Sequence, residues 1–282
     1  MKIIDTYQSI ATAYENGKFD FKKWKSYINA ALPDISRMLI EDSERCLKAG
    51  ADWEKDFLPV LDAVMQDDEL RERAHASFCN VCKNLERTVY EKFEKELDVV
   101  IIFYLGLCNG AGWVTKYKGQ SAILLGIEKI IELNWCSPDD MYGLIYHELG
   151  HVYQGAYGVL DREFENSADT FLWKLFPEGI AMCFEHILVG DSNYYLLDKN
   201  GWKSWCDKHF EEIKKDFDHD LKAMTHADQR YFGDWVKYRG HGDVGYYLGC
   251  RFVRYILSAY KFDDILSFDI NTVTKLYKQF MQ

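Results

Sequence analysis

Proline is scarce in this chain. It accounts for only 4 of the 282 residues, whereas 19 are tyrosine, 17 phenylalanine and 8 tryptophan. Because proline interrupts helices and large aromatic side chains need a sizeable core, this balance favours a compact, mostly helical fold. Hydrophobic residues make up 48% of the chain, more than a disordered or fibrous protein carries. The length allows one large domain or two small ones.

Positive charge is also in short supply. Against 45 acidic residues the chain has 34 basic ones, which gives a formal net charge of −11 at pH 7. Binding to nucleic acid or to an anionic membrane surface depends on cationic patches that this composition does not supply. We therefore expect neither nucleic acid nor a membrane among the partners.

Long apolar segments are missing as well. The longest apolar run lies around residues 99–108, well short of the ~20 residues that a membrane span requires. Residues 1–17 lack the basic and apolar segments of a secretory signal. We therefore expect a cytoplasmic protein whose eight cysteines are reduced.

Two of the cysteines, Cys79 and Cys82, have the spacing of half a zinc site. No second C-x-x-C accompanies them, so the usual four-ligand set is incomplete. They also fall in a strongly helical stretch. Packing is therefore the expected role, with metal binding or redox chemistry as the alternative.

The first region, residues 1–97, is expected to be an N-terminal helical region. Its apolar residues recur near helical spacing, and Pro33 marks a break. Residues 67–97 lack glycine and proline and have apolar residues three or four apart. This pattern predicts one long amphipathic helix.

The pattern changes over the rest of the chain. Short apolar or β-branched runs at 99–105, 113–117 and 121–125 predict a small sheet within a core over residues 98–190. Residues 191–282 return to helical periodicity and are expected to form a C-terminal subdomain that closes the cleft. The predicted class is α+β, predominantly helical, with helical regions flanking the core.

A helix over residues 138–153 carries the chemistry. It begins with Ser137 as a cap, followed by a first-turn proline and two acidic residues. Its sequence includes His147-Glu148-Leu149-Gly150-His151, an H-E-x-x-H motif. Residues four apart lie one turn apart, so both imidazoles can bind one ion, while Glu148 is rotated by about 100° and can reach a water there. Two imidazoles and an oxygen ligand suit zinc, with a structural histidine pair as the alternative.

A third protein ligand is needed for a catalytic zinc site. The metzincin continuation would place glycine at 154 and histidine at 157, but the chain has Gln154 and Tyr157. That class is excluded. The remaining candidates are the carboxylates that follow the motif, Glu163, Glu165, Asp169 and Glu178.

Glu178 is favoured among these carboxylates. Pro177 suits the first turn of a helix, so a new helix is expected to begin there, after one over residues 163–175. A carboxylate at that position faces the loop side, and the following Gly179 allows close approach. Asp169 is the next candidate, as an outer partner of a ligand imidazole.

The motif and the segment around Glu178 together resemble those of a known group of enzymes. H-E-L-G-H followed by P-E-G-I-A-M-C-F-E is similar to the gluzincin metallopeptidases, whose second zinc-binding helix opens with E-G-x-A. Within that group the chain most resembles the bacterial family of predicted zinc-dependent proteases of unknown function. The two zinc segments carry the resemblance, with residues 120–128 and 245–249, and it spans roughly residues 98–260.

The resemblance implies a zincin-like core with one zinc ion per chain, bound by His147, His151 and Glu178. It also implies a further glutamate on the second helix, here Glu185. Glu148 would act as general base on a zinc-activated water. Peptide hydrolysis is the implied reaction, on a peptide or unfolded-protein substrate.

Two further features follow from related enzymes. A tyrosine or histidine from the C-terminal region often stabilises the oxyanion, and Tyr246 and His241 are the candidates here. Their alternatives are a packed tyrosine and a histidine on an exposed turn. An exposed strand before the zinc helix pairs with the extended substrate, and residues 121–125 are the expected edge strand, with an ordinary structural strand as the alternative.

The sequence therefore predicts a cytoplasmic zinc metallopeptidase. A zinc-containing regulatory or partner-binding protein without turnover is the alternative from a different class. Glu148 argues against it, because metal binding alone does not need that residue. A non-peptidase zinc hydrolase is the third reading.

Overall fold

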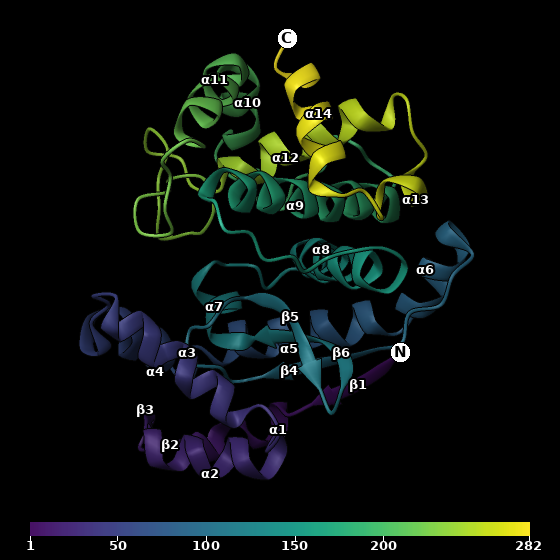
Figure 1. The fold of residues 1–282 in the computed structure, drawn as a ribbon. Coiled ribbons are helices and arrows are strands. Elements are labelled where there is room, and N and C mark those ends of the chain that lie inside the picture. Colours follow the sequence, from purple (N-terminus) through teal and green to yellow (C-terminus); the bar gives the residue numbers. More distant parts are fainter. The chain divides into compact units, whose positions relative to one another are not determined.

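The computed structural model describes residues Met1–Gln282 (Figure 1). The fold is α+β and mostly helical, with a small mixed sheet, as the sequence predicted. The chain forms two compact units, Met1–Glu148 and Leu149–Gln282. The division falls inside helix α8 (Pro138–Tyr157), which contributes one half to each unit.

The N-terminal unit is built on a four-stranded sheet. Its strands are β1 (Lys2–Asp5), β4 (Val99–Tyr104), β5 (Gly112–Tyr117) and β6 (Gln120–Gly126), in the order β1-β4-β6-β5 (Figure 1). Strand β4 runs parallel to β1 and β6, and β5 runs antiparallel to β6. The three predicted strands are confirmed. Strand β1 was missed because it is short and half polar and its partner is far along the chain, with Lys2 opposite Val100.

The edge strand differs from the expectation. Residues 121–125 were expected at the edge, but they belong to β6, which lies between β4 and β5. The residues from Ala122 to Leu125 are buried, as an internal strand requires. The edge strand on this side of the sheet is therefore β5, most of whose residues are half-exposed.

Helices and short strands surround this sheet. They are α1 (Tyr7–Ile10), a 3₁₀ turn (Ala11–Ala13), β2 (Tyr14–Glu15), β3 (Lys18–Phe19), α2 (Phe21–Ala31), α3 (Ser36–Lys48), a π-helical turn (Trp53–Phe57), α4 (Leu58–Ala63), α5 (Asp68–Cys82), α6 (Leu85–Phe93) and α7 (Ile127–Glu132). The predicted break at Pro33 is confirmed. The single helix predicted over residues 67–97 was wrong, because the chain breaks at Asn84 into α5 and α6. Asparagine favours such helix starts over helix interiors.

Strand β4 anchors the core of this unit. The ring of Phe103 stacks on Phe78 of α5, with centroids 4.7 Å apart. Just after the strand, the backbone of Leu105 is held from both sides, because its carbonyl accepts from Trp24 Nε1 at 3.0 Å and its N–H donates to Tyr27 Oη at 3.0 Å. Helix α2 is thereby fixed to the end of β4.

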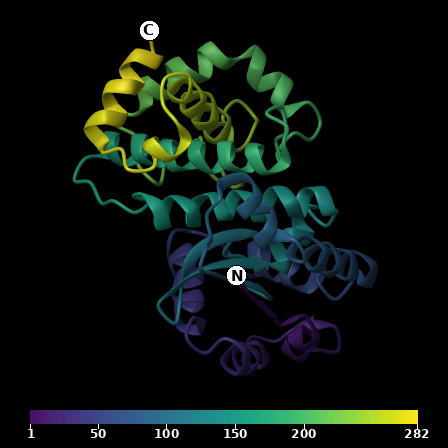
Figure 2. The ribbon, with the colours of Figure 1, turned by 90° about the vertical axis from the view of Figure 1, so that its right-hand side faces the viewer.

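The C-terminal unit is helical. After the second half of α8 it contains α9 (Ser167–Val189), α10 (Trp202–Lys208), α11 (Phe210–Asp220), α12 (Val244–Leu257), α13 (Phe262–Ile265) and α14 (Ile270–Phe280). Figure 2 shows α12 and α14 lying against α9, which is the central helix of the unit. No helix in the protein combines the length and the apolar character that crossing a membrane demands.

Candidate metal centre

Helix α8 presents the H-E-x-x-H motif as predicted, and extends to Tyr157 rather than Tyr153. At its start Ser137 Oγ accepts a hydrogen bond from the N–H of Asp140 at 3.2 Å. Asp139 and Asp140 place negative charge at the positive end of the helix. His147 and His151 therefore lie one turn apart on a regular helix.

Glu178, the third predicted ligand, lies beside His151, although its local structure was predicted wrongly. Glu178 Oε2 lies 3.3 Å from His151 Nε2, and both side chains are about six-sevenths buried, with 15% and 14% exposed. Pro177 does not start a helix but lies inside α9. A proline inside a helix costs about 3 kcal/mol, and the burial of α9 along most of its length offsets this.

The three donors converge. His147, His151 and Glu178 each offer one ligand atom, and these atoms all lie within 4.8 Å of one another. Two imidazole nitrogens and one carboxylate oxygen make a donor set that fits Zn²⁺ with one coordination position left for water or substrate. The residues present therefore fit the ion that the sequence predicted.

Glycine in the motif allows α8 to approach α9 closely. A Cβ built at Gly150 would lie 2.6 Å from the Cα of Ala181, so a larger residue would push the two helices apart. One turn on, the rings of Tyr153 and Phe184 pack with centroids 5.1 Å apart. Both contacts join α8, which carries His151, to α9, which carries Glu178.

Glu148 lies in the N-terminal unit, against the start of the edge strand. Its side chain is buried, with 7% exposed. A Cβ at Gly112 would lie 2.9 Å from Glu148 Cγ and 3.0 Å from Oε1, so only glycine leaves room there for the carboxylate. The general-base candidate is thus held beside the first residue of β5.

Asp169 and Glu185 lie elsewhere on α9. Asp169 is in the first turn, where its N–H donates to Asn166 Oδ1 at 2.8 Å and its carboxylate accepts from Asn166 Nδ2 at 2.7 Å. That carboxylate therefore makes its hydrogen bond within the first turn of the helix and is not in the donor group. Glu185 is seven residues, about two turns, beyond Glu178 and is 1% exposed.

The two oxyanion candidates have different surroundings. The ring of His241 stacks on Trp205 of α10, with centroids 3.8 Å apart, and its backbone pairs with Tyr238. Tyr246 is half-buried in the first turn of α12, with its ring 6.0 Å from that of Phe232. Neither residue belongs to the donor group.

The sequence did not single out Asp243, which lies between them. Its carboxylate accepts from the N–H of Gly233 at 2.8 Å, and burial, assisted by the negative charges of Asp234 and then Glu178, raises its pKa to about 6. Asp243 has a left-handed backbone, with φ of 57°, just before α12. The glycines around it were the only signal of an unusual turn.

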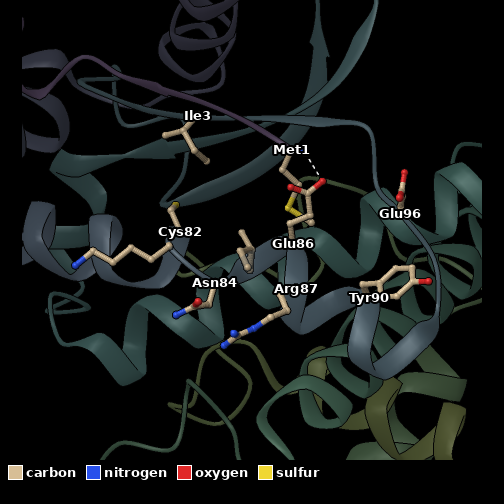
Figure 3. Close-up of a pocket in the computed structure, with 10 residues that line it drawn as sticks. Met1, Ile3, Cys82, Asn84, Glu86, Arg87, Tyr90 and Glu96 are labelled. Atoms are coloured by element: carbon tan, nitrogen blue, oxygen red, sulfur yellow. Dashed lines mark hydrogen bonds and ion pairs between the residues drawn. The ribbon is translucent and has the colours of Figure 1, made fainter.

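A separate surface pocket of about 440 Å³ lies in the N-terminal unit (Figure 3). The amino group of Met1 pairs there with Glu86 at 3.0 Å. No histidine lines it, so it offers no comparable donor set. Its lining residues are Met1, Ile3, Cys82, Lys83, Asn84, Leu85, Glu86, Arg87, Tyr90 and Glu96.

No protein-family model matches this chain, and no curated protein or solved structure is significantly similar to it.

Proposed function

We propose that the protein is a zinc-dependent peptidase with a zincin-like core. The observation that carries this is the donor group His147, His151 and Glu178, with Glu148 on the same helix as two of its members. Structural zinc sites almost always have four protein ligands and need no base, whereas a catalytic site keeps one position open and has a base beside it. Three donors and a neighbouring buried glutamate match the catalytic arrangement.

The roles of the residues follow from their chemistry. A zinc ion in this site would supply Lewis acidity for a water molecule and for the scissile carbonyl. Glu148 accepts the proton of the attacking water and passes it to the departing amine. Tyr246 is the preferred donor to the oxyanion, because the ring of His241 is already stacked on Trp205.

An extended peptide is the substrate that best suits the edge strand. The outer edge of β5 has no strand partner, and its first residue, Gly112, lies against Glu148. A peptide that adds to this edge by backbone hydrogen bonds would bring its own carbonyls past the general base. Such pairing depends on the backbone of the peptide rather than on its side chains. It therefore favours unfolded segments as substrates.

The test is the variant Glu148→Gln, which keeps the shape of the side chain and removes the base. We expect turnover of a mixed peptide pool to fall by about 10²- to 10⁴-fold, with zinc content unchanged. Glu165→Ala, which removes an exposed carboxylate of the same chain, is the control. Its turnover should match that of the wild type.

Two results would contradict the proposal. Unchanged turnover in Glu148→Gln would show that Glu148 is not the general base. A wild-type protein that binds zinc but cleaves nothing in broad peptide libraries would favour the regulatory or partner-binding alternative.

A further inference from the structure

A second group of metal-binding side chains lies in the N-terminal unit, in residues that the peptidase proposal does not use. Asp5, His75 and Cys79 each offer one ligand atom, and these atoms lie within 4.8 Å of one another. His75 Nε2 is 2.6 Å from Asp5 Oδ2 and 3.4 Å from Cys79 Sγ. A carboxylate oxygen and a sulfur thus face the same imidazole nitrogen.

The backbone fixes where these residues lie. His75 and Cys79 are four apart on α5, the spacing that puts two side chains on one face of a helix. Asp5 ends strand β1, and its register opposite Phe103 of β4 is set by the sheet. Neither element has to move to bring the three donors together.

The donors are also oriented by their neighbours. The other oxygen of Asp5, Oδ1, accepts the N–H of Tyr7 at 2.9 Å, which turns Oδ2 toward His75. The imidazole stacks on the ring of Tyr7 with centroids 3.9 Å apart and an angle of 7° between the planes. Outer contacts of this kind are what holds ligands in place in metal sites.

A Cys-His-Asp relay for nucleophilic catalysis is the obvious rival. In such a relay the base contacts the nucleophile through one ring nitrogen and the carboxylate through the other. Here Asp5 and Cys79 both contact Nε2. No proton can pass from the thiol through the ring to the carboxylate, so the geometry does not fit a relay.

We propose that Asp5, His75 and Cys79 form a second site for a divalent transition-metal ion. Zinc is the ion that this combination of nitrogen, sulfur and oxygen donors favours. Tetrahedral coordination at zinc bond lengths separates nitrogen and sulfur donors by about 3.5 Å and nitrogen and oxygen donors by about 3.3 Å. The first spacing is already present, and the second requires a widening of less than about 1 Å. Cys79 binds as the thiolate and releases its proton to solvent.

An ion bound there ties strand β1 to helix α5, two segments some 70 positions apart in the sequence. Sulfur among the ligands excludes magnesium and calcium as the preferred ions. No carboxylate beyond Asp5 belongs to the group, so no general base accompanies this site. Three protein donors leave the fourth position to a water molecule, and because no base stands beside that water, the role of the site is to hold the strand rather than to turn over a substrate.

Cobalt distinguishes the two sites, because only this one contains sulfur. The experiment titrates Co²⁺ into the reduced, metal-free full chain carrying Glu178→Ala, which disables the other site. We expect one Co²⁺ to bind with a thiolate-to-cobalt charge-transfer band. Cys79→Ser should abolish the band, and Asp5→Asn should weaken Co²⁺ binding by at least about tenfold.

Cys82→Ser is the matched control, because Cys82 lies on the same helix but lines the surface pocket with Met1 and Ile3 (Figure 3). It should keep the band. His75→Gln, which leaves the thiol in place, guards against misfolding of Cys79→Ser and should also lose the band. The proposal is overturned if no band appears in the parent protein, if Cys79→Ser retains it, or if Cys82→Ser removes it.

Discussion

The sheet of the N-terminal unit and the helix pair α9 and α12 of the C-terminal unit are held in place by different physical means. In the N-terminal unit buried polar groups hold the backbone, as where Glu128 accepts from the N–H of Gly106 at 2.8 Å and from that of Cys108 at 3.1 Å. In the C-terminal unit glycines let helices touch. A Cβ at Gly249 would lie 2.6 Å from the carbonyl oxygen of Leu175, and one at Gly150 would lie 2.6 Å from the Cα of Ala181.

This difference predicts different sensitivities. A buried carboxylate responds to pH, because burial penalises only its charged form. A glycine contact is indifferent to pH and responds to side-chain volume. The stability of the sheet should therefore depend on the ionisation of Glu128, whereas the contact between α9 and α12 should respond to the addition of a single methyl group at Gly249.

The largest expected effect on stability is that of Gly249→Ala. The new methyl group would meet backbone atoms of α9, at Leu175 and Gly179, which cannot rotate away. Moving the two helices apart should lower the free energy of unfolding by about 3 kcal/mol. Urea unfolding of the wild type and the variant measures this.

Gly155→Ala is the control, because its methyl group would meet only Leu160, at 3.6 Å or more. It lies in helix α8, where alanine is favoured over glycine by about 0.5–1 kcal/mol. We expect this variant to be slightly more stable than the wild type. Equal losses in both variants would show that close helix contacts do not set the stability of this unit.

Glu128→Gln tests the pH sensitivity of the N-terminal unit. Burial raises the pKa of Glu128 from 4.5 to about 7. Because the folded pKa lies above the ordinary value, ionisation opposes folding. A cost of about 3 kcal/mol therefore develops as the pH rises from about 4.5 to 7.

Glutamine does not ionise, so Glu128→Gln should lack this part of the pH dependence. The free energy of unfolding of the variant relative to the wild type should rise by about 3 kcal/mol between pH 4.5 and pH 7.5. Unfolding curves at these two pH values are the measurement. Parallel pH profiles for the two proteins would mean that the buried carboxylate does not control the stability of the sheet.

Local patterns explain what the sequence predicted correctly. The i, i+4 spacing of His147 and His151 and the capping signals at Ser137 act within one helix, so they could be read directly. The strands at β4, β5 and β6 were visible as short apolar runs. Glu178 was found from its place after the motif, although the reasoning about a helix start there was wrong.

Long-range packing explains what the sequence did not show. Strand β1 forms only by pairing with β4, almost a hundred residues away, and β6 lies inside the sheet because β4 pairs with one of its edges and β5 with the other. Pro177 stays helical because α9 is buried among its neighbours. The group of Asp5, His75 and Cys79 depends on that same β1 pairing, so Cys79 looked like a packing residue.

Zinc content tests the central claim most directly. Wild type, Glu178→Ala and the control Glu165→Ala would be purified identically without chelators, and zinc per folded chain measured by elemental analysis. The account predicts that Glu178→Ala contains one zinc ion fewer per chain than the wild type and that Glu165→Ala contains the same amount. Equal zinc in the wild type and Glu178→Ala, or no zinc in the wild type even after reconstitution, would contradict it.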